Sequence, residues 1–109
     1  MKFAIKNPVF FAGSGKAAEG YIKLSALKML RHLRFTPQDA AMDRLMRASC
    51  NCSLRSACVR LIKRAKVMRV DSDTLDVMFD KEDEKTVKLI TYGNGVVYGS
   101  NILQVIFHG

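Results

Sequence analysis

Residues 53–66, SLRSACVRLIKRAK, carry the clearest structural pattern in the chain. Ser53 can accept a hydrogen bond from a free backbone N–H at the start of a helix, and apolar residues then recur at intervals of three and four. These apolar positions are Leu54, Ala57, Cys58, Leu61, Ile62 and Ala65. The pattern predicts a helix with one buried face.

Two further helices are expected before this one. Apolar residues recur at helical spacing from about residue 16 to residue 34. The segment Thr36-Pro37-Gln38-Asp39 is typical of a helix start, because Thr accepts from the backbone, Pro fits the first turn and Asp favours the positive end. This second helix is expected to end near Ala48, and Ser49–Cys52 then forms a turn.

After Lys66 the residue types favour strands. Val67–Val70 and Thr74–Phe79 are rich in β-forming residues, and Asp71-Ser72-Asp73 is typical of a turn between them. Asn94-Gly95 predicts a second hairpin, because both residues tolerate a positive φ angle. The further strands are expected at Thr86–Tyr92, Val96–Tyr98 and Ile102–Phe107.

The chain of 109 residues has the usual length of one domain, and its 49% hydrophobic residues are typical of a globular protein. We expect an α+β fold in a single domain over residues 1–109: a basic helical half, residues 1–66, and a β half, residues 67–109. The β half is expected to form an antiparallel sheet of three to four strands. Lys2–Lys6 is a candidate edge strand.

Charge is divided between the two ends of the sequence. Residues 1–69 contain fifteen Lys and Arg against three acidic residues, a net charge of +12, whereas residues 70–109 contain three Lys against seven acidic residues, a net charge of −4. A concentration of positive charge of this size attracts polyanions and speeds their capture. It therefore indicates a class of partner and says nothing about the fold.

The strongest functional indication lies in the basic residues around the third helix. They lie off its apolar positions, and no acidic residue falls between Ser53 and Val70. The predicted nucleic-acid-binding residues are Arg55, Arg60, Lys63, Arg64, Lys66 and Arg69. Lys28, Arg31, Arg44 and Arg47 would add a diffuse positive field. The first hypothesis is therefore a nucleic-acid-binding protein, with DNA favoured over RNA.

Residues 60–70, RLIKRAKVMRV, followed by Asp71-Ser72-Asp73 and residues 74–79, resemble the passage from recognition helix to wing in winged helix-turn-helix domains. The resemblance covers roughly residues 36–79 and implies a small DNA-binding regulator whose third helix enters the major groove. This mode of binding requires Arg60, Lys63 and Arg64 to face solvent. Internal pairing of these three residues with carboxylates of the β half, or their burial beneath the sheet, would end the case for a polyanion partner.

Two other hypotheses remain. The first is a structural or assembly protein of a phage or mobile element, whose oppositely charged halves join in a homo-oligomer or whose basic face meets an acidic protein partner. The second is a ribonuclease that is similar to the RelE-like toxins and would use His108, expected at the end of the last strand, or His32. An enzyme is the less favoured class, and no catalytic residue is assigned.

No metal or cofactor is expected. Cys50, Cys52 and Cys58 do not have the spacing of a zinc knuckle, and Cys58 occupies an apolar helix position. Gly13-Ser14-Gly15-Lys16 superficially suggests a phosphate-binding loop, but Ala17 stands where that motif needs a hydroxyl. Apolar runs are far shorter than the ~20 residues of a membrane span, and an odd number of cysteines favours a reducing compartment, so a cytoplasmic location is expected.

Overall fold

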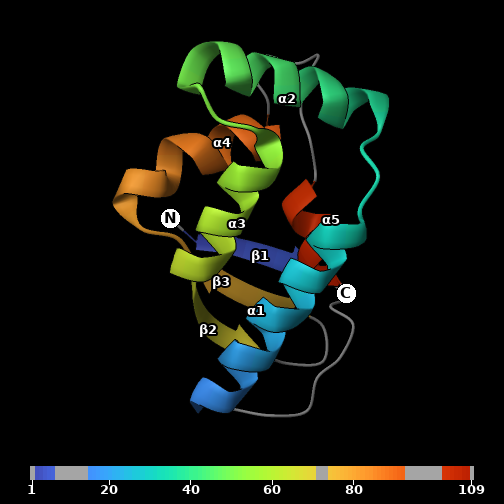
Figure 1. Cartoon of the computed structure of the whole chain (residues 1–109). Helices are drawn as coiled ribbons and strands as arrows, with labels where there is room; N and C mark the ends of the chain where they lie inside the picture. Colours follow the sequence, from blue (N-terminus) through green and yellow to red (C-terminus); the bar gives the residue numbers. More distant parts are fainter. Residues whose placement is uncertain (1, 7–14, 71–73, 93–101, 109) are drawn as a thin grey trace.

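The structure is a computed structural model that describes residues 2–6, 15–70, 74–92 and 102–108 (Figure 1). The chain has an α+β fold. Its elements are β1 (Lys2–Lys6), α1 (Gly15–His32), α2 (Pro37–Cys50), α3 (Leu54–Arg64), β2 (Lys66–Val70), β3 (Thr74–Met78), the 3₁₀ turn η1 (Lys81–Asp83), α4 (Glu84–Tyr92) and α5 (Ile102–His108).

Three described strands form an antiparallel sheet in the order β1-β3-β2, so β3 pairs with both neighbours. The predicted edge strand over Lys2–Lys6 is confirmed. In β2 the register with β3 shifts between Val67 and Arg69, which places Met68 in a bulge. Only two described strands, β2 and β3, follow the three helices. The three to four strands predicted for the second half of the chain are not shown, because the residues that the structure describes there contain two.

The segment predicted as a strand over Thr86–Tyr92 is the helix α4. Val87, Ile90 and Thr91 are buried, and this spacing of three and four residues places them on one side of a helix. The Thr91 hydroxyl donates to the backbone carbonyl of Val87 at 2.6 Å, so its polar group is satisfied within the helix. Burial against the core overrides the strand preference of the β-branched residues.

The predicted strand over Ile102–Phe107 is likewise a helix, α5. Its buried residues are Ile102, Leu103, Ile106 and Phe107. They come in two adjacent pairs four residues apart, which is a helical pattern rather than the alternation of a strand. The helix packs against α1, α4 and β1, so it is a central element of the core rather than a sheet edge.

Some predictions fall outside the described residues. These are the turn at Asp71-Ser72-Asp73, the Asn94-Gly95 hairpin, the strand at Val96–Tyr98 and the first two residues of the Gly13–Lys16 segment. The antiparallel pairing of β2 with β3 on either side of residues 71–73 does confirm that these two strands form a hairpin.

The predicted start of α2 is confirmed in detail. Thr36 is the N-cap, and its hydroxyl accepts from the backbone N–H of Asp39 at 3.1 Å. The Asp39 carboxylate in turn accepts from the Thr36 N–H at 3.1 Å, which completes a capping box. The helix ends at Cys50, two residues later than predicted, because Asn51 adopts a left-handed conformation with φ 53°.

The third helix is also confirmed, with its apolar face buried. Ser53 caps α3 by accepting from the Ser56 N–H at 3.1 Å, and all six predicted apolar positions of the segment are buried. The helix ends at Arg64, because Ala65 is already extended. Lys66 and Arg69 therefore lie in β2 and not in the third helix.

The core joins the helices to one another and to the sheet. α1 packs against α3 and α5, α2 packs against α3, and α4 packs against α5. Figure 1 shows α2 across the top of the molecule, away from the sheet, with α1 and α3 below it. In the described part of the chain, no helix combines the length and the apolar character that crossing a membrane requires.

Candidate nucleic-acid interface

Arg55, at the start of α3, binds the end of α1. Its guanidinium group donates to the backbone carbonyls of Leu30 and Leu33, and it lies over the ring of Phe35 at 4.5 Å from the centroid. The last carbonyls of a helix lack their i+4 partners, and the Leu30 carbonyl accepts a 3.3 Å bond from the Leu33 N–H instead. A planar group with five donors is suited to bind two such carbonyls at once. Arg55 thus connects α3 to α1, although its charge stays near the surface.

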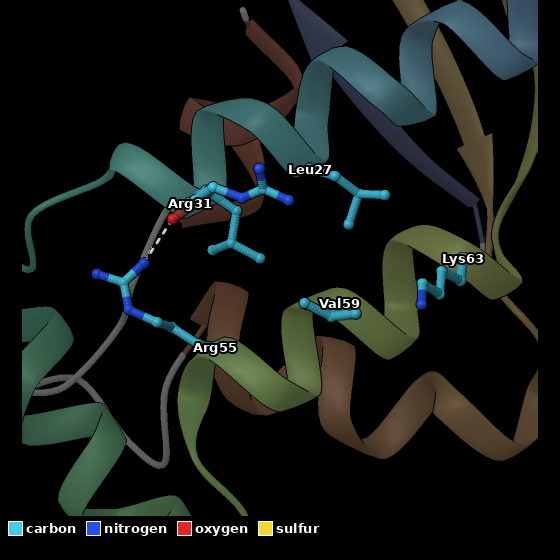
Figure 2. Close-up of a pocket in the computed structure, with 6 residues that line it drawn as sticks. Leu27, Arg31, Arg55, Val59 and Lys63 are labelled. Atoms are coloured by element: carbon cyan, nitrogen blue, oxygen red, sulfur yellow. Dashed lines mark hydrogen bonds between the residues drawn. The ribbon is translucent and has the colours of Figure 1, made fainter.

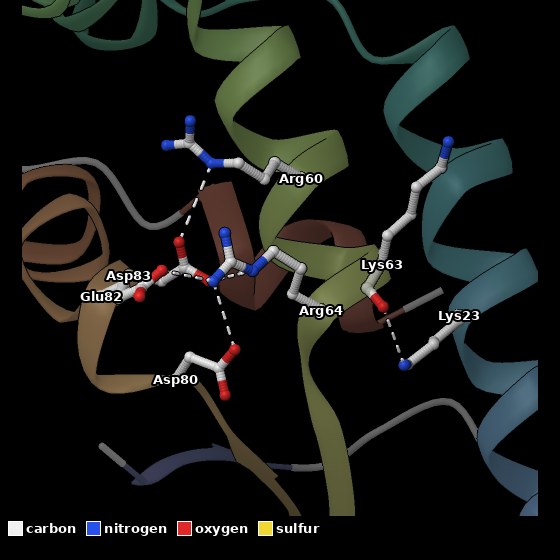
Figure 3. A network of polar contacts seen from close by, with 7 residues as sticks. All are labelled: Lys23, Arg60, Lys63, Arg64, Asp80, Glu82 and Asp83. Atoms are coloured by element: carbon white, nitrogen blue, oxygen red, sulfur yellow. Dashed lines mark hydrogen bonds and ion pairs between the residues drawn. The ribbon is translucent and has the colours of Figure 1, made fainter.

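Arg64, at the end of α3, pairs with three carboxylates. One of its terminal nitrogens lies 3.3 Å from Asp80 and 3.1 Å from Glu82, and its Nε lies 3.2 Å from Asp83 (Figure 3). The hydrogen bonds that Arg64 donates to Glu82 and Asp80 raise the pKa of its guanidinium above the ordinary value, with a further contribution from the charge of Asp83.

Arg60 shares one of these carboxylates. Its Nε lies 3.8 Å from Asp83, whose side chain is only 3% exposed, whereas that of Arg60 is 47% exposed. Figure 3 shows Arg60 and Arg64 reaching toward the same acidic turn from one side of α3. The requirement that these two arginines face solvent without internal carboxylate partners is not met. They form an ion-pair cluster with Asp80, Glu82 and Asp83, which we call the acidic clamp.

Lys63 extends from a different side of α3. Its side chain is exposed, and its backbone carbonyl accepts a hydrogen bond from Lys23 Nζ of α1 at 3.2 Å. Lys23 also lies 3.6 Å from Glu19, and the other Glu19 oxygen accepts from the backbone N–H of Val67 at 2.8 Å. These contacts join α1 to both α3 and β2.

The remaining two predicted binding residues lie in the sheet. Lys66 is exposed and stands opposite Met78 of β3, and Arg69 stands opposite Asp76 in the backbone register. The structure thus distributes the six predicted residues over four places, of which the sheet is one. Arg55 lies at the end of α1, Arg60 and Arg64 in the acidic clamp, and Lys63 beside α1.

An open groove runs between α1 and α3, with a volume of about 400 Å³. Its lining is Leu27, Leu30 and Arg31 from α1, and Arg55, Val59 and Lys63 from α3. Figure 2 shows side chains from the two helices on either side of it. We call this feature the α1–α3 groove. Among the described residues that line it, three are cationic, three are aliphatic and none is acidic.

The residues expected to add a diffuse field are exposed, but they are not equivalent. Arg47 forms an ion pair with Asp43 one helical turn away at 2.9 Å. Lys28, Arg31 and Arg44 are exposed, and Arg31 reaches into the α1–α3 groove. From the sequence, Arg31 was expected only to add to a diffuse positive field. Its role in a groove depends on the packing of α1 against α3, and no local pattern indicates that packing.

The cysteines and histidines are dispersed. Cys50 is exposed, Cys52 is partly buried and Cys58 is buried, and the described residues contain no group of three or more side chains that could hold a metal ion. Burial raises the pKa of the Cys58 thiol to about 12. His32 is exposed at the end of α1. His108 ends the helix α5, so its predicted place at the end of a strand is wrong.

Comparisons of the chain with protein-family models, with curated protein sequences and with solved structures give no match.

Proposed function

We propose that the protein binds nucleic acid through the α1–α3 groove, with Arg31 and Lys63 as its main phosphate contacts. The observation that carries this proposal is the composition of the groove, which three cationic side chains line from end to end while none of the described lining residues is acidic. Phosphate groups are recognised chiefly by such clusters of Lys and Arg, which displace the counterions condensed on the nucleic acid.

This proposal keeps Lys63 from the predicted binding residues and gives a direct contact to Arg31, which was expected to add only to a diffuse field. It moves the interface from the side of α3 that carries Arg60 and Arg64 to the side that faces α1. Arg60 and Arg64 lie in the acidic clamp, where a phosphate would have to compete with carboxylates already at 3.1–3.3 Å from Arg64. Lys63 lies on the other side of α3, where it lines the α1–α3 groove at the end opposite Arg31 (Figure 2). Docking through the α1–α3 groove therefore breaks no ion pair between the residues that the structure describes, whereas docking through Arg60 and Arg64 does.

The test is a titration with labelled nucleic acid at two salt concentrations. We expect binding that weakens steeply between about 50 and 200 mM salt, because bound counterions are released on association. The variant Arg31→Glu/Lys63→Glu should bind at least about tenfold more weakly and should reduce the slope of log affinity against log salt by roughly two, one for each lost phosphate contact.

The matched control is Lys81→Glu/Lys85→Glu, which makes the same change in net charge at exposed positions on η1 and α4. If binding depends on the α1–α3 groove, this control should retain most of the affinity. Equal loss in the two variants would instead indicate non-specific attraction to the total charge. Absence of binding at low salt would contradict the proposal.

A further inference from the structure

The aliphatic side of the α1–α3 groove is not explained by phosphate binding alone. Leu27 of α1 and Val59 of α3 lie between the exposed Arg31 at one end and the exposed Lys63 at the other (Figure 2), and Leu30 also lines the groove. A phosphate gains nothing from apolar side chains, which cannot donate hydrogen bonds to it. The groove is therefore complementary to a ligand that carries an anionic part and an apolar part side by side.

A duplex does not offer this combination. Its bases are stacked and paired inside the helix, so the surface it presents to a narrow groove consists of phosphates and sugars. In a single strand the bases are free to leave the stack, and each base has a broad apolar face directly beside its phosphate. A groove of about 400 Å³ is also in the size range of sites that hold a small ligand or a single unstacked nucleotide.

Arg55 explains why the groove is already formed without a ligand. Because its guanidinium binds the Leu30 and Leu33 carbonyls and covers Phe35, it fixes the end of α3 against the end of α1. At the other end, the hydrogen bond from Lys23 Nζ to the Lys63 carbonyl joins the same two helices. A site held at both ends loses little conformational entropy when a ligand enters.

We propose that the α1–α3 groove binds single-stranded nucleic acid, with an unstacked base between Leu27 and Val59 and the adjacent phosphates at Arg31 and Lys63. This inference rests on the proposed function and specifies its ligand. It assigns Leu27 and Val59 a role in binding that the charge of the molecule does not indicate. Arg55 is a positioning residue, since two of its donors hold the Leu30 and Leu33 carbonyls at the end of α1.

The experiment compares three probes of equal backbone length at low salt: an oligodeoxythymidine of about twelve nucleotides, the same strand paired with oligodeoxyadenosine, and an abasic strand with the same phosphates. We expect the oligodeoxythymidine to bind at least about fivefold more tightly than the abasic strand, which is the lower end of the effect of a single base contact. The duplex should bind more weakly than the single strand, despite its larger charge.

A pair of variants on one helix tests the apolar contact. Leu27→Ser removes a groove side chain, and Leu24→Ser removes an exposed leucine of α1 that does not line the groove. Leu27→Ser should weaken oligodeoxythymidine binding severalfold and leave abasic binding unchanged, whereas Leu24→Ser should change neither. Denaturation of both variants shows whether each is folded under the binding conditions. If Leu27→Ser is unfolded, Val59→Thr, which keeps the side-chain shape, replaces it.

The outcomes separate this inference from the proposed function. Equal binding of intact and abasic strands, or tighter binding of the duplex, would overturn the base contact, while loss of binding in Arg31→Glu/Lys63→Glu would still support nucleic-acid binding. No binding of any probe would overturn both. Tighter binding of an amphipathic peptide of Glu and Leu than of oligodeoxythymidine would overturn the inference in favour of an acidic protein partner.

Discussion

Three arginines of this protein have the same charge and very different surroundings. Arg55 donates to carbonyls at the end of α1, Arg64 pairs with three carboxylates, and Arg31 reaches into the α1–α3 groove. Arg55 also lines this groove, but two of its donors hold backbone carbonyls, whereas Arg31 reaches into the groove from the exposed side of α1. The position of a guanidinium in the fold, rather than its formal charge, decides whether it is available to a polyanion.

Cys58 offers a direct test of burial at a single residue. Because burial raises the pKa of its thiol to about 12, almost no reactive thiolate is present at pH 8. We expect a thiol reagent such as Ellman's reagent to label the exposed Cys50 rapidly and Cys58 only after unfolding in urea. In the variant Cys50→Ser, the rapid labelling that comes from Cys50 should disappear. Rapid labelling of a Cys50→Ser/Cys52→Ser protein under native conditions would show that Cys58 is accessible.

Asp43 links stability to pH. The hydrogen bond from the Leu54 backbone N–H at 2.8 Å, together with Arg47, holds the pKa of Asp43 below its ordinary value. The unfolded chain therefore takes up this proton first as pH falls. The stabilisation is complete above roughly pH 4, the ordinary range of an Asp carboxyl, and is lost as pH falls through the lower pKa of the folded state.

The corresponding variant is Asp43→Ala. It removes the acceptor for the first backbone N–H of α3, so we expect a loss of about 1 kcal/mol in the free energy of unfolding at pH 7. Urea denaturation at pH 7 and at a pH below the folded pKa measures the difference. The loss should shrink at the lower pH, where the wild-type carboxyl is itself protonated. An equal loss at both pH values would show that the charge of Asp43 contributes nothing.

At the scale of elements, the acidic clamp joins the end of α3 to η1. Asp83 is nearly inaccessible to solvent and lies between Arg60 and Arg64, so removing it leaves two guanidinium groups without that partner. We expect Asp83→Ala to cost about 2–3 kcal/mol, and a double-mutant cycle of Arg64→Ala with Asp83→Ala to give a coupling above about 1 kcal/mol. Urea denaturation of the four proteins provides the measurement.

The control cycle uses Glu84 and Lys88, one helical turn apart on α4 at 3.1 Å. Exposed pairs of this kind contribute only about 0.3–0.5 kcal/mol. A coupling between Arg64 and Asp83 no larger than that of the control pair would show that the acidic clamp does not hold η1 against α3. Arg64, whose side chain is 37% exposed, would then be available to an external anion.

For some helices and strands, the pattern of neighbouring residues was sufficient to predict the structure. The starts of α2 and α3 follow from Thr36 and Ser53, because the capping side chain and the N–H that it accepts are only three residues apart. The hairpin of β2 and β3 follows from two β-rich segments around a polar turn. In α4 and α5 the same β-forming residue types lie in helices, because short apolar segments adopt the structure that buries them best.

At the scale of the whole molecule, the division of charge along the sequence does not produce a basic half and an acidic half in space. The acidic segment that follows β3 folds back on α3 and supplies Asp80, Glu82 and Asp83 to its arginines. Part of the positive charge is thereby balanced internally. The α1–α3 groove is left with three cations and no described acidic residue in its lining, and it is there that we place the interface.

The sequence by itself determined the helices α1, α2 and α3, the buried face of α3 and the excess of positive charge, because helix caps and apolar periodicity act over three or four residues. Only the tertiary structure decided that residues 84–92 and 102–108 are helices and which cations remain available. Arg64 and its carboxylate partners are 16 to 19 residues apart, and Arg31 and Lys63 are 32 apart. Contacts over such separations depend on how the elements pack, and no local pattern encodes that.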